Sequence, residues 1–200
     1  MLLNAILDAL ANLLILGLIP FGLYATYHKV RHKRTISEIT QRAGLQRGDL
    51  RYMGYAAGLA LLVVIGLIIW PPSVETMGRE GSAFRDFVGL GLTPTSIAMA
   101  LIYGVVKTGL AEEFLFRGLI AGSLARRLPE KAANITQALI FLLPHLLILT
   151  IAPDLWPMLI IVLVGAYVSG WLRIRSESIL APWLLHAVAN VTNALLVAMQ

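Results

Sequence analysis

Long apolar stretches alternate with short polar segments along the whole chain. A spanning α-helix needs about 20 predominantly apolar residues, and the length of these stretches favours helices over buried strands. Two pairs of small residues, Gly54 with Gly58 and Gly118 with Gly122, have the spacing that lets membrane helices approach closely. We predict transmembrane helices over six ranges: residues 1–27, 52–70, 95–124, 134–150, 157–172 and 179–199.

The composition agrees with a membrane protein. Hydrophobic residues make up 58% of the 200 and charged residues 14%, whereas soluble domains carry about 25% charged residues. We therefore predict an all-α fold, a polytopic membrane helix bundle of about six transmembrane helices around a polar intramembrane cavity. Residues 1–200 are expected to form a single transmembrane domain. The chain has no cysteine, which excludes disulfides and thiolate metal sites.

The positive charges are distributed unevenly among the loops. The loops at 29–51, 125–133 and 173–178 hold seven, three and two Lys or Arg residues, against two at 71–94 and none at 151–156. The positive-inside rule then places the first three loops in the cytoplasm and both termini outside. We expect an integral multi-pass protein of the cell membrane. The net charge of +5 does not indicate nucleic-acid binding, because the basic residues lie between the spans.

The most informative motif is Glu112-Glu113-Phe-Leu-Phe-Arg117, which lies inside the third predicted span. An ionisable side chain near the bilayer centre costs roughly 2.5–3.5 kcal/mol, so such groups persist where they are paired, hydrated or used. Glu113 and Arg117 are four residues apart on one helix face and are predicted to form an ion pair. Glu112 lies about 100° away around an α-helix and is left to face a cavity as a candidate general base. An ion-pair cluster that only locks helix packing is the alternative.

Two further spans each carry one histidine. Pro144 precedes His145 and removes a backbone hydrogen bond, which predicts a kink that opens space beside the imidazole. His186 and Asn190 are one turn apart on one helix face, and an asparagine can donate hydrogen bonds to an oxyanion without adding charge. Interior packing and interhelical hydrogen bonding are the alternative roles for these residues.

Three other polar residues are assigned no catalytic role. Lys107 lies nearer the outer side of the third span, where snorkelling or charge balance accounts for it. His28 and His32 are spaced by four in a basic run at the membrane edge. We expect these two histidines to face lipid headgroups rather than to bind a metal.

The three polar motifs, in this order and each on its own predicted helix, resemble those of the CPBP (Abi) family of membrane-embedded proteases, which includes the type 2 CAAX prenyl endopeptidases. The family signature is Glu-Glu-x-x-x-Arg, then Phe-x-x-x-His, then His-x-x-x-Asn or Asp. The resemblance places the catalytic core at about 95–200, and the first two spans add only hydropathy. The matching residues are Glu112, Glu113, Arg117, Phe141, His145, His186 and Asn190.

The resemblance implies an intramembrane endopeptidase that hydrolyses a membrane-proximal peptide bond in a cavity reached from the cytoplasmic side. Glu112 and His145 would activate a water molecule, and His186 with Asn190 would bind and stabilise the oxyanion. The partners would be a peptide or protein substrate at the membrane and the lipid bilayer. Some family members carry a polar residue one turn after the first motif histidine, where this chain has Leu149.

The supporting residues and the cofactor follow from the same resemblance. Glu113 and Arg117 would hold the helix and the first acid in place. Two chemistries fit the motifs: a metal-free reaction, and a zinc ion held by Glu112, His145 and His186 with an open water position. The sequence has no His-Glu-x-x-His motif, and we favour the metal-free reaction.

Two other functions stay open. The chain could be a catalytically silent membrane scaffold or a bacteriocin-immunity-type protein on the same fold. It could also be a proton-coupled transporter, because acids and histidines on facing helices also form proton relays. The sequence lacks an evident inverted repeat of the kind that many transporters show.

Overall fold

The computed structural model describes residues 1–79, 81–150 and 152–200. All secondary structure in these residues is helical, without a β-strand. Within this part of the chain, six helical stretches are long and apolar enough to cross a membrane. The predicted polytopic helix bundle is therefore confirmed, and the chain is an integral multi-pass membrane protein. The stretches are Leu2–His32, Arg51–Ile69, Pro94–Ala125, Glu130–Thr150, Pro153–Ser176 and Leu180–Ala198.

Most spans contain more than one helical segment. In chain order the segments are α1 (Leu2–Asn12), the π-helical η1 (Leu13–Leu18), α2 (Ile19–His32), α3 (Ile36–Arg42), α4 (Arg51–Ile69), α5 (Val74–Met77), the 3₁₀ turn η2 (Arg85–Phe87), α6 (Pro94–Leu101), the π-helical η3 (Ile102–Leu110) and η4 (Glu113–Ala121), α7 (Gly122–Ala125), α8 (Glu130–His145), the 3₁₀ segments η5 (Leu146–Thr150) and η6 (Pro153–Leu155), α9 (Trp156–Ser176) and α10 (Leu180–Ala198).

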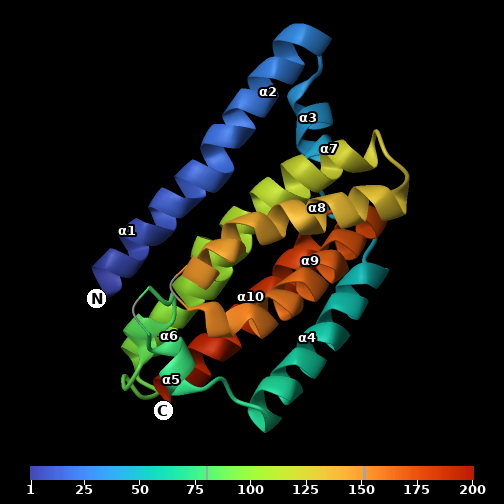
Figure 1. Ribbon diagram of the computed structural model, residues 1–200. Helices are drawn as coiled ribbons and strands as arrows, with labels where there is room; N and C mark the ends of the chain where they lie inside the picture. Colours follow the sequence, from blue (N-terminus) through green and yellow to red (C-terminus); the bar gives the residue numbers. More distant parts are fainter. Residues whose placement is uncertain (80, 151) are drawn as a thin grey trace.

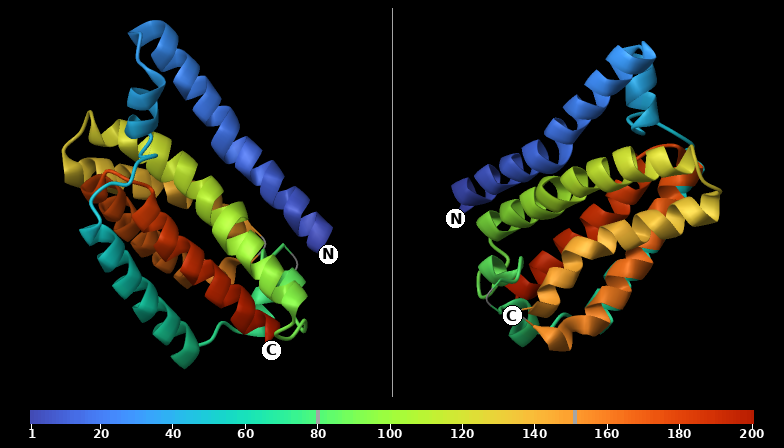
Figure 2. Two further views of the ribbon diagram at one scale, coloured as in Figure 1. Left: turned by 180° about the vertical axis from the view of Figure 1, so that it is seen from behind. Right: turned by 45° about the horizontal axis from the view of Figure 1, so that its top comes forward.

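The three spans that carry the polar motifs are neighbours in the bundle. Helix α10 packs against α4, α6, α9 and η3, and η4 contacts α8, α9 and α10. The long helix formed by α1, η1 and α2 lies along the outside of the third span (Figure 1). Its C-terminal end leans away from the bundle, and α3 turns back toward it (Figure 2). The motifs are thus brought together in the half of the molecule formed by the later spans.

The third span is a less regular helix than the sequence analysis assumed. It begins as expected, because the Thr93 hydroxyl accepts a hydrogen bond from the Ser96 N–H and Pro94 occupies the first helical position. It then contains η3 and η4, whose π-helical turns are wider than α-helical turns. The assumption of α-helical geometry was therefore wrong for these segments. π-Helical turns occur frequently at functional sites.

The two predicted glycine pairs differ in their packing. A Cβ on Gly122 would lie 2.9 Å from the carbonyl oxygen of Arg42, and a Cβ on Gly118 would be equally close to a backbone oxygen. The third span therefore packs tightly on the end of α3. No atom of another segment lies within 4 Å of the Cβ position at Gly54 or Gly58. The predicted close approach is confirmed for the second pair and wrong for the first.

The basic loops gather at one end of the bundle, and both termini lie toward the other end (Figure 1). The chain after α3 is tied to the turn between α9 and α10. The Ile179 N–H donates to the Gly44 carbonyl over 3.0 Å, and the Asp49 N–H donates to the Ser176 carbonyl over 3.0 Å. The predicted six-span topology requires this separation of the basic loops from the two termini. The assignment of the basic end to the cytoplasm stays a prediction from charge.

The two histidines at the end of α2 have different surroundings. His28 is buried at 8% exposure, and its ring centre lies 4.3 Å from that of Tyr24. His32 is exposed one turn later. The expectation that both histidines lie on the protein surface was therefore wrong for His28, because α3 and the end of the third span fold back over this part of α2.

Candidate active site

The ion pair of the third span is buried within the bundle. Arg117 Nη1 lies 3.0 Å from Glu113 Oε1, and the two side chains are 2% and 0% exposed. The predicted pair is therefore confirmed. Arg117 also donates to the Ala166 carbonyl of α9 over 3.4 Å, and its guanidinium carbon lies 4.2 Å from the centre of the Phe141 ring of α8. The ion pair thus joins three spans.

Glu113 also binds the histidine of the last span, which the sequence analysis did not predict. His186 Nδ1 lies 2.9 Å from Glu113 Oε1, the oxygen that also faces Arg117. An ionised carboxylate only accepts hydrogen bonds, so Nδ1 carries a proton and Nε2 is left for another partner. A carboxylate that orients an imidazole through Nδ1 recurs in hydrolases and in metal sites.

Glu112 is the acid of the motif without such a partner. Its Oε2 is buried and makes no hydrogen bond with the residues that the structure describes. The groups that act electrostatically on its carboxylate are His186 and His145, followed by Glu113 and Arg117. The first acid and the two histidines belong to three different spans and are close enough to act on one another electrostatically. A buried polar atom without a partner calls for a ligand or an ordered water.

His145 lies at the end of α8, where Pro144 interrupts the helix and a 3₁₀ segment follows. Its Nδ1 lies 2.8 Å from the Phe141 carbonyl oxygen. A carbonyl only accepts, so Nδ1 carries the proton and Nε2 of the neutral ring is an acceptor. The centre of the Phe141 ring is 4.7 Å from that of His145 and 6.4 Å from that of His186. Phe141 therefore packs near both imidazoles.

Asn190 is positioned by a residue that the sequence analysis missed. Its Nδ2 donates to the Thr108 hydroxyl over 2.8 Å. Thr108 is buried and donates in turn to the Tyr103 carbonyl, five residues earlier, over 3.0 Å. One N–H of Asn190 stays available for another acceptor. The signal that could have revealed Thr108 is its position four residues before Glu112 in the same span.

A zinc ion at this site would need three protein ligands. Among the described residues, no three His, Cys, Asp or Glu side chains are grouped so that they could hold a metal ion. Glu112, His145 and His186 are near one another but are not arranged as a ligand set. The zinc alternative therefore stays untested by the structure, and we assign no step of the reaction to a metal.

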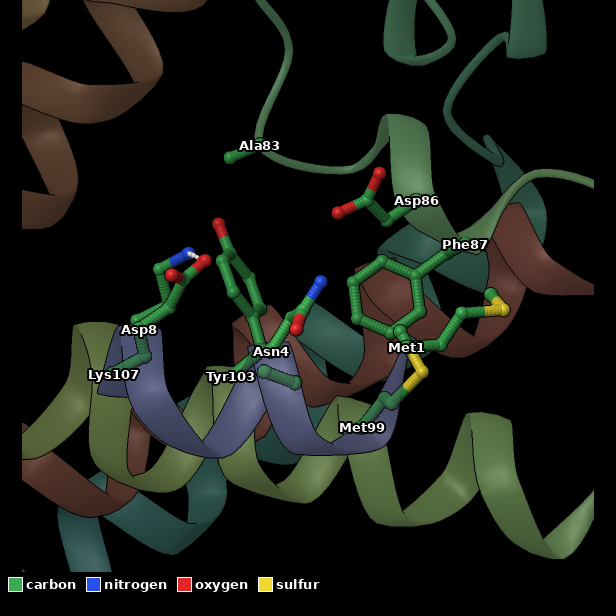
Figure 3. Close-up of a pocket in the computed structure, with 10 residues that line it drawn as sticks. Met1, Asn4, Asp8, Ala83, Asp86, Phe87, Met99, Tyr103 and Lys107 are labelled. Carbon is green, nitrogen blue, oxygen red and sulfur yellow. Dashed lines mark hydrogen bonds and ion pairs between the residues drawn. The ribbon is translucent and has the colours of Figure 1, made fainter. Parts of the chain in front are cut away.

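A separate polar cavity lies toward the end of the bundle where the termini are. It has a volume of about 210 Å³ and opens between α1, η2 and η3 (Figure 3). Tyr103 points into it, and Lys107 pairs with Asp8 over 3.1 Å at its edge. The charge-balancing role predicted for Lys107 is thus confirmed. No predicted catalytic residue lines this cavity, so the polar cavity expected around the catalytic residues stays a prediction.

The three motifs lie in a region that matches a known family. Residues 93–192, which are half of the chain, match the family described as "Type II CAAX prenyl endopeptidase Rce1-like". No curated protein and no solved structure matches the chain. The family supports an intramembrane endopeptidase of the CAAX-protease type. The chain belongs to the Rce1-like family of type II CAAX prenyl endopeptidases, in agreement with the resemblance of its motifs to the CPBP family.

Proposed function

We propose that the protein hydrolyses a membrane-proximal peptide bond with a water molecule activated by Glu112 and His145, while His186 and Asn190 stabilise the oxyanion. The observation that carries the proposal is the buried Glu112 Oε2, which has no hydrogen-bond partner although both imidazoles act on its carboxylate. Burying a carboxylate oxygen without a partner costs free energy. A water or substrate bound at that oxygen accounts for its retention.

The protonation of His145 supports a shared water molecule. Because Nδ1 donates to the Phe141 carbonyl, the neutral ring offers Nε2 as an acceptor. The Glu112 carboxylate is an acceptor as well. Two acceptors can take both hydrogens of one water, and its oxygen lone pairs are then directed at the substrate carbonyl.

The hydrogen-bond partners of His186 and Asn190 support their assignment to the oxyanion. In the proposed step the water oxygen bonds to the carbonyl carbon and one water proton passes to Glu112. Asn190 donates through its remaining N–H, and His186 donates through Nε2 as an imidazolium that the Glu113 carboxylate stabilises over 2.9 Å. Collapse of the intermediate breaks the C–N bond. The proton on Glu112 goes to the leaving amine, which yields a carboxylic acid and an amine.

The proposed substrate is a peptide or protein segment held at the membrane. The acidic motif lies within a span whose flanking helices are apolar, so a bond must be presented to it at or within the bilayer. We further propose that the protein resides in the cell membrane with the basic loops in the cytoplasm and both termini outside. A prenylated C-terminal tail is one substrate of this kind.

The test is cleavage of a membrane-anchored fluorogenic peptide by the purified protein in lipid nanodiscs. Glu112→Gln removes the base without changing side-chain size and is expected to lower kcat by about 10²–10⁴-fold. His145→Ala is expected to lower kcat within a similar range. Glu130→Gln is the matched control, because Glu130 pairs with Arg175 near the surface, and it should leave cleavage unchanged.

Three outcomes would contradict the proposal. Cleavage by Glu112→Gln at the wild-type rate would exclude Glu112 as the base. Cleavage that is lost on adding a chelator and restored by zinc would replace the metal-free step. Absence of cleavage by the wild-type protein, together with a wild-type cellular effect in Glu112→Gln, would favour the catalytically silent scaffold.

A further inference from the structure

Four arginines gather at the basic end of the bundle, where the described part of the chain places no acid at ion-pair distance from them. Arg126 and Arg173 both donate to the carbonyl oxygen of Arg42, over 3.0 and 3.2 Å. Arg34 belongs to the same group, because its charge and that of Arg42 act on both Arg126 and His28. Burial lowers the pKa of the Arg126 guanidinium, and the charges of Arg42 and Arg34 lower it further. Among the described residues, none of the four forms an ion pair with an acid.

The packing of the bundle makes room for this cluster. Its members come from the turn after α2, from α3, from the end of α7 and from α9. Gly44 has a positive φ of +74°, and a Cβ there would lie 2.6 Å from Arg173 Nε. A Cβ on Gly122 would lie 3.0 Å from Arg173 Nη2. Two glycines thus allow Arg173 to reach the Arg42 carbonyl, so the cluster is part of the helix packing.

Several polar atoms of the cluster have no hydrogen-bond partner within the described ranges. Arg34 Nε, Arg42 Nε and His28 Nδ1 are buried without a hydrogen bond. His28 is 8% exposed and stacks on Tyr24, whose hydroxyl accepts from Arg126 Nη2 over 3.0 Å. Buried guanidinium donors without acceptors cost free energy, and an oxyanion supplies the acceptors.

Two acids interact with the cluster through their charges, but neither forms an ion pair with it among the described residues. The Glu38 carboxylate accepts from the Thr35 N–H over 2.7 Å and from the Thr35 hydroxyl over 3.0 Å, as part of the capping box of α3. Glu177 acts on Arg173 only through its longer-range charge. Neither acid satisfies the unpartnered nitrogens, so an anion from outside the protein is the group that fits.

The cluster lies where lipid headgroups are expected. The first span ends at His32 and the third at Ala125, so Arg34 and Arg126 follow the apolar segments within two residues. Basic residues at this level meet the headgroup layer. Arginine recognises phosphate oxygens with two parallel hydrogen bonds, which suits a cluster of several guanidinium groups.

We propose that Arg34, Arg42, Arg126 and Arg173, together with His28, bind the phosphate of an anionic lipid headgroup in the leaflet at the basic end. A free phosphate ion shares this chemistry, and the experiment separates the two sources. The site does not depend on the proposed peptidase activity, because none of its side chains belongs to the three motifs.

The experiment measures ligand retention by the full chain after delipidation in a neutral detergent. Phosphatidic acid, phosphatidylcholine and inorganic phosphate are added separately, and bound ligand is measured by native mass spectrometry. The midpoint of thermal unfolding is the second readout. The wild-type protein is expected to retain phosphatidic acid and to be stabilised by it, and to retain phosphatidylcholine and inorganic phosphate much more weakly.

The test variant combines Arg34→Gln with Arg42→Gln. Neither side chain has a hydrogen bond of its own within the described residues, so the variant is expected to fold, and its unfolding midpoint without lipid checks this. The control combines Arg31→Gln with Arg127→Gln, which removes the same charge from two exposed arginines at the same end. Each lost charge-assisted contact weakens binding roughly tenfold, so the test variant should bind about 100-fold more weakly. The control should stay within about twofold.

The outcomes separate a built site from general attraction to a basic surface. Equal losses in the two variants, or no retention by the wild-type protein, would overturn the proposal. Phosphate binding as tight as that of phosphatidic acid, and lost only in the test variant, would keep the phosphate site and assign it to free phosphate. If the double variant unfolds, Arg42→Lys replaces it, because lysine keeps the charge but loses the planar fork. None of these readouts requires cleavage, and they should be the same in a Glu112→Gln background.

Discussion

The centre of the third span and the basic end of the bundle differ in whether their charged side chains have partners of opposite charge. In the centre, Glu113 is fully buried and contacts Arg117 and His186 within 3.0 Å. At the basic end, Arg42 and Arg173 approach each other without an acid at ion-pair distance among the described residues. The two regions are in direct contact, because Arg173 Nε donates to the Arg117 carbonyl over 3.0 Å.

The difference follows from what surrounds each region. Lipid tails offer no hydrogen bonds, so charges within the spans must be compensated by side chains of the protein itself. At the membrane surface, water and headgroups can supply the compensation. In each region the charged group without an ion-pair partner among the described residues is therefore the informative one. It is Glu112 in the centre, where we propose a bound water, and Arg34 with Arg42 at the basic end, where we propose a phosphate.

The largest effect on the stability of the fold is expected when Glu113, the ion-paired acid, is made neutral. Glu113→Gln leaves Arg117 buried without a counter-charge and is expected to destabilise the fold by about 3–5 kcal/mol. Glu112→Gln removes an acid that has no partner at Oε2 and should leave stability unchanged or higher. Chemical unfolding of both variants in the same detergent makes the comparison. Equal destabilisation by the two substitutions would show that Glu112 is also part of the ionic network.

A smaller effect is expected where the two regions pack together. Gly122→Ala places a Cβ 2.9 Å from the Arg42 carbonyl oxygen and 3.0 Å from Arg173 Nη2. The backbone has to shift, which costs about 1–3 kcal/mol as overpacking does. Gly58→Ala is the control, because its Cβ position is open. Unfolding midpoints of the two variants that differ by less than the experimental error would contradict the tight packing at Gly122.

Removing the residue that positions Asn190 should affect catalysis more than folding. Thr108→Val deletes the hydroxyl that accepts from Asn190 and is expected to lower kcat roughly tenfold with little change in KM. Thr108→Ser restores the hydroxyl and should recover most of the activity. A change in KM as large as the change in kcat would show that Thr108 acts only in packing. Failure of the serine variant to recover activity would show the same.

The sequence predicted those features of the site that depend on one helix. Hydropathy predicted the spans within a few residues of their observed ends, and the spacing of four predicted the ion pair of Glu113 with Arg117. The order of the three motifs indicated the family. These inferences succeed because apolar length and the helical repeat are local properties of the chain.

The missed contacts depend on how separate spans meet. His186 reaches Glu113, and Asn190 reaches Thr108, only because α10 packs against η3 and η4. The π-helical turns of the third span also change which side chains share a helix face. No residue pattern in the sequence predicted these turns. The arginine cluster was hidden for a related reason. The positive-inside rule accounts for the number of basic residues in a loop. It does not predict that α3 packs back onto the third span, which is what brings the arginines together.

The smallest effect is expected on the pH dependence of α3 stability, through Glu38 beside the arginine cluster. Hydrogen bonds from the Thr35 backbone N–H and then from its hydroxyl lower the pKa of Glu38 below its ordinary value of 4.5. A lowered folded-state pKa means that the capping box stabilises α3 above pH 4.5 and is lost as the pH falls through the folded-state pKa. Hydrogen exchange of the α3 amides should therefore accelerate at low pH relative to Glu38→Gln, whose side chain does not titrate. The charges of Arg34 and Arg42 contribute to the same lowering, so saturating phosphatidic acid should move the transition to higher pH. If phosphatidic acid does not shift the pH of this hydrogen-exchange transition, the cluster does not bind the lipid phosphate.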